Sequence, residues 1–321
     1  MSWSNNNIIA DYCPVWFLRF SHVNTVYPTL FRKDPDVRYT RQRLITDDDD
    51  FLDVDLLTQS NKRLVILCHG LEGSSRSKYI LGTAAHLHSN GWDIASMNYR
   101  GCSGEINKQK IIYNSGATYD LNRVIEEYLP HYDEIAIVGF SLGGNLVLKY
   151  MGDGIFPLSE KIRACVAISV PVDLREGSLN IAKRSNFIYE KKFLKSLINK
   201  VKQKALQYPD TYNLEAMDSV LTLYDFDDIY TGPIHGYRDA DHYYAACSAK
   251  PYIVSIERPT MIINALDDPF LPEECYPYQE IESNRNVIGC FPKYGGHVGF
   301  AHWRQSVYWE EAQILSFINS V

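Results

Sequence analysis

The chain has 321 residues, of which 45% are hydrophobic and 22% are charged, and its formal net charge is −7. This composition is typical of a globular protein with a sizeable core. The acidic balance argues against a general nucleic-acid binder, which needs a basic face, and no apolar run approaches the ~18 residues of a membrane-spanning helix.

The cysteines and the N-terminus indicate an intracellular protein. The 7 cysteines are odd in number and widely spaced, and no Cys-x-x-Cys pair occurs. This usage is typical of reduced, mostly buried thiols. Residues 1–7 lack the basic and apolar regions of a secretory signal. We therefore expect a cytoplasmic location.

The first half of the chain predicts an arm, a hairpin and then alternating strands and helices. Residues 8–35 carry many large aromatic side chains and predict an arm that packs on the main body. Two alternating runs, 37–46 and 51–57, flank an acidic turn and predict an antiparallel hairpin. The elements expected next are a strand at 63–68, a helix at 77–89, a strand at 92–98, a helix at 116–129, a strand from Ile135 and a strand at 162–170. Buried strands that alternate with helices predict a parallel sheet between helix layers.

The pattern changes between residues 175 and 255, where we find no convincing buried strand. Residues 187–207 predict a basic amphipathic helix, and residues 214–223 predict a second helix. We interpret 175–255 as a helical cap inserted into an α/β core, which is formed by 1–174, including the arm, and by 256–321. The elements expected in the last part are a strand at 259–266, a helix near Glu273, a strand at 286–292 and a closing helix at 303–318.

The segment around Ser141 carries the clearest chemical signal. Gly139-Phe140-Ser141-Leu142-Gly143 joins a predicted buried strand to a predicted helix. Gly-x-Ser-x-Gly alone also occurs in turns without chemistry, but between a strand and a helix it is typical of a nucleophile elbow. Side chains at the two glycine positions would collide with the neighbouring strand and helix. The sequence therefore predicts Ser141 as a nucleophile at a helix N-terminus, where backbone N–H groups favour negative charge.

A serine nucleophile needs a base, and in such sheets an acid and then a histidine follow the serine along the chain. His297 follows the last predicted strand on a Gly-Gly turn, and His302 is the fallback. Asp267 and Asp268 both follow the strand after the cap. We favour Asp268, four residues before a proline, as the acid that orients His297. Asp267 would then support the turn or the cap, and the choice between the two stays open.

Two backbone N–H groups are expected to bind the oxyanion. One belongs to Leu142, the residue after the nucleophile, and the other to Leu71 in the turn that follows the strand at 63–68. His69, in the same turn, is expected to hydrogen-bond within its loop rather than to react.

Together these motifs resemble the YheT-like subgroup of α/β-hydrolases, which includes bacterial esterases and animal abhydrolase-domain lipases and phospholipases. The matching stretches, which span nearly the whole chain, are Tyr27-Pro28-Thr29-Leu30-Phe31-Arg32, His69-Gly70-Leu71-Glu72-Gly73-Ser74, Asn98-Tyr99-Arg100-Gly101-Cys102-Ser103-Gly104-Glu105, Gly139-Phe140-Ser141-Leu142-Gly143-Gly144-Asn145, Phe226-Asp227-Asp228, Tyr243-Tyr244, Asp267-Asp268-Pro269-Phe270 and Tyr294-Gly295-Gly296-His297-Val298-Gly299-Phe300. The resemblance implies an α/β-hydrolase fold with a mostly parallel sheet, flanking helices and a helical cap. It also implies a serine carboxylic-ester hydrolase with Ser141, Asp268 and His297 as its triad, but it supplies no substrate. One departure, Asp49-Asp50-Phe51-Leu52 in place of Asp-Gly-Asp-Phe, is expected only to change the hairpin turn.

Several functions remain open at this stage. The first is hydrolysis of a short-chain or medium-chain acyl ester, or of a lipid ester, through an acyl-serine intermediate. The second is acyl transfer to an alcohol by the same triad, and the third is a silent fold that binds a ligand, against which the intact triad argues. We expect a small-molecule or lipid ester as substrate, no nucleic acid and no cofactor, while oligomeric state is not visible in the sequence.

Two charged clusters in the cap have competing interpretations. The basic helix at 187–207 is either a solvated face, which we favour, or a weak peripheral contact to anionic membrane. The acidic residues and histidines that follow match no metal-ligand spacing, so we expect no metal and assign them to hydrogen bonds that order loops. These residues are Asp225, Asp227, Asp228, His235, Asp239 and His242.

Overall fold

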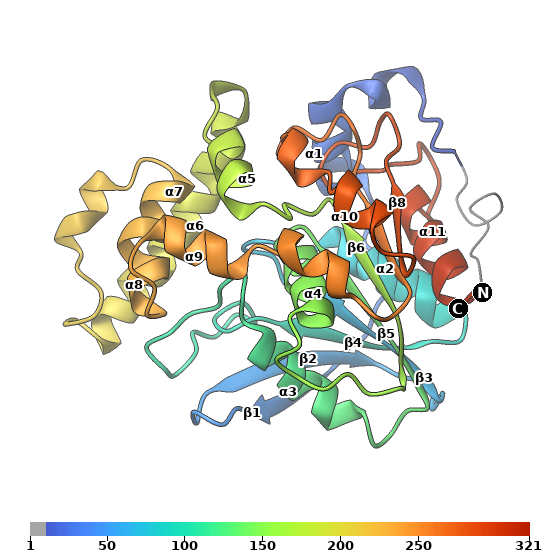
Figure 1. Ribbon diagram of the computed structural model, residues 1–321, viewed down its shortest axis with the longest axis horizontal. Coiled ribbons are helices and arrows are strands. Elements are labelled where there is room, and N and C mark those ends of the chain that lie inside the picture. The colour runs from blue at the N-terminus through green and yellow to red at the C-terminus, as the bar shows by residue number, and fades with distance from the viewer. Residues whose placement is uncertain (1–10) are drawn as a thin grey trace.

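A computed structural model describes residues 11–321, in which one eight-stranded sheet carries helices on both faces (Figure 1). Its strand order is β1-β2-β4-β3-β5-β6-β7-β8. The pairs β1–β2 and β2–β4 are antiparallel and all other pairs are parallel. The strands are β1 (Thr40–Ile45), β2 (Phe51–Leu57), β3 (Arg63–Cys68), β4 (Asp93–Asn98), β5 (Glu134–Phe140), β6 (Ile162–Ile168), β7 (Thr260–Ile263) and β8 (Val287–Cys290). The expected hairpin and mostly parallel sheet are confirmed.

Helices connect the strands and form the cap. The α-helices are α1 (Ser21–Phe31), α2 (Lys78–Ser89), α3 (Thr118–Tyr128), α4 (Leu142–Gly152), α5 (Leu174–Ile181), α6 (Phe187–Gln207), α7 (Leu223–Phe226), α8 (Gly232–Ile234), α9 (Ala240–Cys247), α10 (Tyr278–Glu282) and α11 (Trp309–Ile318). The 3₁₀-helical turns are η1 (Trp16–Arg19), η2 (Arg184–Asn186), η3 (Glu215–Ser219), η5 (Lys250–Ser255) and η6 (Glu273–Cys275), and η4 (Asp227–Thr231) is a π-helical turn. Within the described residues, no helix has the length and hydrophobicity needed to cross a bilayer.

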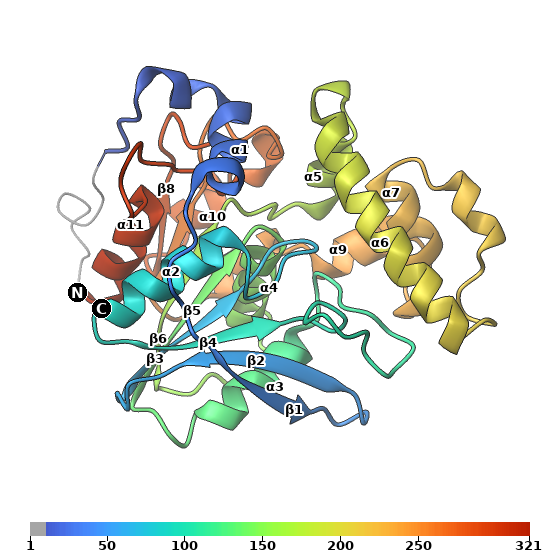
Figure 2. The same ribbon diagram turned by 180° about the vertical axis from the view of Figure 1, so that it is seen from behind.

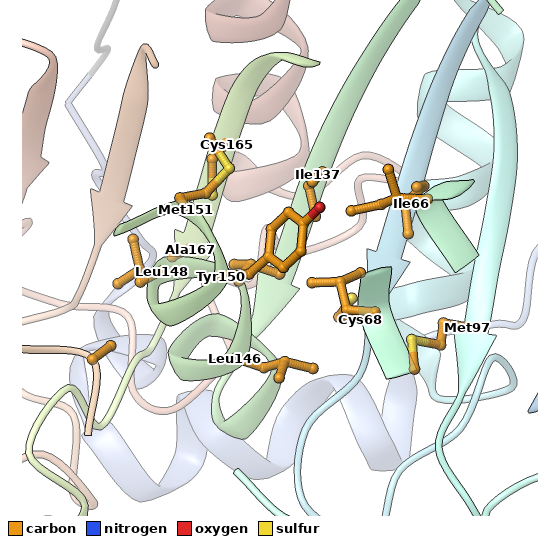
Figure 3. Close-up of a cluster of buried hydrophobic side chains, with 14 of the residues drawn as sticks. Ile66, Cys68, Met97, Ile137, Leu146, Leu148, Tyr150, Met151, Cys165 and Ala167 are labelled. Atoms are coloured by element: carbon orange, nitrogen blue, oxygen red, sulfur yellow. The ribbon is translucent and has the colours of Figure 1, made fainter. Parts of the chain in front are cut away.

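The core has two halves because successive side chains of a strand point to opposite faces of the sheet. In β3, Leu64 and Ile66 join the half covered by α3 and α4, whereas Val65 and Leu67 join the half covered by α2 and α11. Figure 3 shows Tyr150 of α4 among the apolar side chains of the first half. Full burial of a Leu or Ile side chain stabilises the fold by about 1.5–3 kcal/mol. This packing fixes the position of the turn between β5 and α4.

Among the described residues, all secondary structure between β6 and β7 is helical. Helices α5 to α9 gather at one end of the sheet, and α1 of the arm lies at the same end (Figures 1 and 2). Ala249 and Ile253, close to the end of this segment, belong to the main core. The division into core and cap at residues 174 and 255 therefore stays a prediction.

Three predicted helices differ from those in the structure. Residues 214–223 do not form one helix, because Thr222 and Asp225 make a capping box that starts α7 afresh. The helix expected near Glu273 is only the short turn η6, and α10 begins after Pro277. The closing helix begins at Trp309 instead of 303, because Tyr308 and Glu311 form a second capping box.

The arm packs on the body as predicted over residues 11–35, while residues 1–10, including the segment examined for a secretory signal, lie outside the described residues. Tyr12 donates a hydrogen bond to the Ala301 carbonyl (2.8 Å). Arg32 pairs with the buried Glu311 of α11 (2.6 Å). These contacts tie the arm to the loop and helix that follow β8.

The basic helix α6 is confirmed, but its lysines do not all face solvent. Lys204 is buried and donates to the carbonyl oxygens of Asn107 (2.6 Å) and Gln109. Burial lowers the pKa of Lys204 to about 8. Lys200 is also buried and pairs with Glu72 (2.5 Å). The exposed lysines of α6 are Lys191, Lys192, Lys195 and Lys202.

Asp50 does more than shape the hairpin turn. It is buried and receives hydrogen bonds from the Arg100 guanidinium (3.1 Å) and from the backbone N–H of Lys108 (2.7 Å). The expectation of a purely local role was wrong, because a buried carboxylate must find donors and these come from a distant loop.

Candidate active site

Ser141 occupies a strained turn between β5 and α4. Its backbone has φ 53° and ψ −118°, which is unusual for a residue with a side chain. A Cβ on Gly139 would lie 2.2 Å from the Gly143 carbonyl oxygen, and a Cβ on Gly143 would lie 2.4 Å from that of Cys68. Neither position can hold a side chain without moving backbone. The predicted elbow geometry is confirmed.

The structure brings Ser141, His297 and Asp268 together. His297 Nε2 lies 2.9 Å from Ser141 Oγ, and its Nδ1 lies 2.9 Å from Asp268 Oδ2. Asp268 is buried, and its Oδ1 accepts the Phe270 N–H (2.9 Å). A proton on Nδ1, held by the carboxylate, leaves Nε2 free to accept the serine proton. His302, the fallback, instead pairs with Gln305 (2.9 Å).

Asp267 has a different task from its neighbour. Its Oδ1 accepts the N–H of Gly296 (2.9 Å), directly before His297. Burial, aided by the charge of Asp268, raises the pKa of Asp267 to about 6. Asp267 therefore supports the turn that carries His297, which is one of the two roles predicted for it.

Residues that the sequence analysis missed also hold the His297 loop. The His297 N–H donates to Thr25 Oγ1 of α1 (2.9 Å), and the Val298 N–H donates to Ser169 Oγ (2.9 Å). Asn24 accepts the Ala301 N–H (3.1 Å). The sequence gives no signal for these partners, since a hydroxyl on a helix far away in the chain looks like a surface residue.

A rigid turn after β3 carries Leu71. The Gly70 N–H donates to Tyr79 Oη (2.9 Å), and the Glu72 N–H donates to Tyr113 Oη (2.9 Å). Leu142 is the first residue of α4, where the N–H has no acceptor within the helix. Leu71 and Leu142 both line a cavity together with Ser141. Their role as oxyanion donors stays a prediction.

His69 hydrogen-bonds at its loop, as expected. Its Nε2 accepts the Tyr99 N–H (3.3 Å), so Nδ1 carries the proton and donates to the Gly70 carbonyl (2.7 Å). Burial lowers the pKa of His69 to about 3, so the ring is neutral.

Two cavities meet at Ser141. One, of about 100 Å³, is mostly apolar and extends under the cap; Leu174, Ile181, Leu197 and Phe226 are among its walls. The other, of about 760 Å³, is a groove between α1, the turn after β3 and α6, and His297 lies in its wall. An ester carbonyl at Ser141 can thus place one substituent in each space.

An aromatic chain crosses the groove above His297. The rings of His22 and Tyr189 are stacked with centroids 5.8 Å apart, and His22 Nδ1 lies 3.2 Å from Tyr189 Oη. Tyr189 packs on Phe270 (4.8 Å), which packs on His297 (4.2 Å). The arm, through His22, and the cap, through Tyr189, therefore both belong to the row of contacting rings that ends at His297.

Comparisons with known proteins agree with this geometry. Residues 63–301 match the alpha/beta hydrolase fold family. The chain is 36% identical over 301 residues to the YheT protein of Escherichia coli (strain K12), covering 91% of this chain and 87% of that relative. It is 27% identical to phospholipase ABHD3 of Homo sapiens (95% and 80% covered) and 25% identical to a monoacylglycerol lipase of Saccharomyces cerevisiae (83% and 61% covered).

Solved structures share the fold at low sequence identity. The esterase Pf2001 of Pyrococcus furiosus superposes with a TM-score of 0.54 at 16% identity, covering 81% of this chain and 85% of that chain. Est1E of Butyrivibrio proteoclasticus, solved with ferulic acid bound, gives 0.55 at 13% identity and covers 88% and 98%. The expected fold class is confirmed.

Proposed function

Because the chain belongs to the α/β-hydrolase family, in the branch that contains YheT, we propose that it is a serine hydrolase that cleaves carboxylic esters through an acyl-serine intermediate. The observation that carries the proposal is the continuous hydrogen-bond chain from Ser141 through His297 to Asp268, with both links at 2.9 Å. The esterase, phospholipase and lipase names of its sequence relatives support the same reaction class.

The reaction follows from this chain of groups. Ser141 Oγ attacks the ester carbonyl carbon while its proton passes to His297 Nε2, and the Leu71 and Leu142 N–H groups stabilise the oxyanion. Collapse breaks the bond to the alcohol, which takes the proton from His297. Water then attacks the acyl-serine and gives its proton to His297. Collapse of this second intermediate breaks the bond to Ser141 Oγ, which takes the proton back from His297, and the acid is released. Asp268 orients the ring and stabilises the imidazolium in both steps.

The two cavities divide the substrate. We place the acyl group in the apolar cavity and the alcohol part in the open groove. The small size of the first favours short or medium acyl chains, while the groove accepts a large alcohol such as that of a lipid ester.

We also infer a weak peripheral contact between the groove rim and anionic membrane. Ile188 and Lys192 of α6 line the groove opposite Val26 of α1. Ile188 is 78% exposed and Phe187 is 52% exposed beside the exposed lysines of this helix. Exposed apolar and cationic side chains on one rim are typical of a surface that lies on a charged bilayer.

Hydrolysis of p-nitrophenyl esters with acyl chains of about 2 to 16 carbons tests the proposed function. We expect Ser141→Ala to lower kcat by about 10⁴-fold or more while the fold is kept. A fluorophosphonate probe should label the wild type and not the variant, because only an activated serine reacts. Addition of an alcohol acceptor such as glycerol distinguishes acyl transfer, which would yield a new ester. Equal activity of both proteins, or no labelling of the wild type, would contradict the proposal.

A further inference from the structure

Two cap motifs, Phe226-Asp227-Asp228 and Tyr243-Tyr244, have no part in the reaction described above. The structure brings both to the apolar cavity that begins at Ser141. Against mostly hydrophobic walls they contribute a polar patch, made with residues of α5 and η4. The side chains of this patch are Asp227, Tyr244, Ser178 and Thr231.

The patch is ordered by its own hydrogen bonds. Tyr244 Oη donates to Asp227 Oδ2 (2.7 Å), and the Thr231 side chain also hydrogen-bonds Asp227. The Tyr244 and Ser178 hydroxyls lie 3.1 Å apart. Since the single Tyr244 proton goes to the carboxylate, Ser178 donates to Tyr244. Asp227 keeps lone pairs that none of these three groups uses.

Asp227 differs from the other carboxylates near it. Asp225 caps α7, and Asp228 accepts the Ala240 N–H at the start of α9 (2.9 Å). Asp239 likewise caps α9 through the His242 N–H (2.7 Å). These three order local structure, as the sequence analysis expected. Asp227 instead lines the cavity.

The Asp227 carboxylate lies outside the ion pairs of the described residues. Among residues 11–321 no lysine, arginine or histidine forms an ion pair with Asp227. Burial raises its pKa to about 6, so it is mostly ionised at neutral pH. A carboxylate on the wall of a mostly apolar cavity is costly without a positive partner, and a ligand that donates a hydrogen bond or brings a positive charge offsets that cost.

We propose that Asp227, ordered by Tyr244 and Thr231, is a subsite that selects acyl groups carrying a hydrogen-bond donor, either a hydroxyl or an ammonium group, away from the ester carbonyl. This inference rests on the proposed ester hydrolysis at Ser141. A purely alkyl chain of the same length leaves the remaining lone pairs of the Asp227 carboxylate without a donor, whereas a donor on the chain can bind them. Sites built around a buried polar group discriminate in this way.

Paired substrates test the subsite. The kcat/KM values for the p-nitrophenyl esters of 3-hydroxybutanoate, 6-hydroxyhexanoate and 6-aminohexanoate are each divided by that of the unsubstituted ester of equal length. Two chain lengths are used because the distance from the ester carbonyl to Asp227 along the cavity sets where the donor must lie on the chain. We expect at least one ratio to exceed unity by about tenfold in the wild type and to fall to unity or below in Asp227→Leu. Asp227→Asn should lose the preference for the ammonium substrate.

A matched control carries the same change of charge. Asp218 lies in the same cap segment but is exposed, so Asp218→Asn should keep the wild-type ratios. Circular dichroism checks the fold, and Asp227→Asn carries the test if Asp227→Leu does not fold. Ratios at or below unity for every pair in the wild type, or ratios that Asp227→Asn and Asp227→Leu both leave unchanged, would overturn the subsite. Hydrolysis that persists in Ser141→Ala would instead overturn the proposed function.

Discussion

The Glu72 carboxylate links the turn that carries Leu71 to the cap. Its Oε1 accepts hydrogen bonds from Lys200 Nζ (2.5 Å) and Tyr113 Oη (2.7 Å), and its Oε2 accepts one from Ser196. Its backbone has φ 54°, so the turn is held in a conformation that it would not adopt alone. The position of the Leu71 N–H therefore depends on a contact to α6.

We expect Glu72→Gln to lower kcat about tenfold with a smaller change in KM. The neutral amide cannot form an ion pair with Lys200, so the Leu71 N–H, the proposed oxyanion donor, loses its fixed position while the cavities stay intact. Steady-state kinetics with a short p-nitrophenyl ester measures the split between kcat and KM. Glu105→Gln, which removes an exposed carboxylate paired with Arg43, is the control. A KM effect alone would refute a positioning role for Glu72.

Single residues could be predicted from the sequence where the reaction requires one residue type. They could not be predicted where two residues of the same type differ only in how the folded chain orients them. Ser141 and His297 could be chosen because the elbow and the chain order leave little choice. Asp267 and Asp268 are chemically identical neighbours, and only the local turn decides that Asp268 faces the imidazole and Asp267 the Gly296 N–H. Thr25, Tyr79 and Tyr113 could not be found, because their partners are backbone groups brought near by the fold.

The arm helix α1 contacts the loop that carries His297. Its Thr25 accepts the His297 N–H (2.9 Å) and donates to the Ser21 carbonyl (2.8 Å). A Cβ on Gly296 would lie 2.6 Å from that same Ser21 oxygen, so the helix is in direct contact with the loop. We expect the arm to fix the direction of the imidazole ring.

Thr25→Val should slow fluorophosphonate labelling of Ser141 several-fold and lower kcat. Valine has nearly the shape of threonine but leaves the His297 N–H without its acceptor. Thr25→Ser keeps the hydroxyl and should restore both rates. If Thr25→Val labels as fast as the wild type, α1 does not position His297.

Elements were predictable in proportion to their length and periodicity. The strands of the sheet and the long helix α6 stood out because their apolar side chains repeat clearly. The segment at 214–223 did not form the predicted helix, since Leu214 (48% exposed) and Leu221 (75% exposed) find no core and the Thr222 cap starts a new helix. Lys200 and Lys204 fit a solvated face by sequence, yet both reach carboxylate or carbonyl oxygens on other segments.

Charge is unevenly distributed over the whole molecule, because exposed lysines gather beside the groove of an otherwise acidic protein. The formal net charge is −7, yet α6 beside the groove exposes Lys191, Lys192, Lys195 and Lys202. Across the groove, α1 exposes Val23 (42%) and Leu30 (64%). This arrangement would orient the groove toward an anionic bilayer and keep the rest of the acidic surface away from it.

Vesicle co-sedimentation tests this orientation. We expect the wild type to sediment with anionic vesicles, less so at high salt, and not with neutral ones, because each lysine near the surface contributes about 1 kcal/mol. Reversal of Lys191, Lys195 and Lys202 to glutamate should abolish binding. The matched control reverses Lys62, Arg163 and Arg285, exposed cations at the start of the strands and thus at the opposite edge of the sheet. If the wild type stays in the supernatant, or if both triple variants bind equally weakly, then α6 is a solvated face and substrates reach the groove from solution.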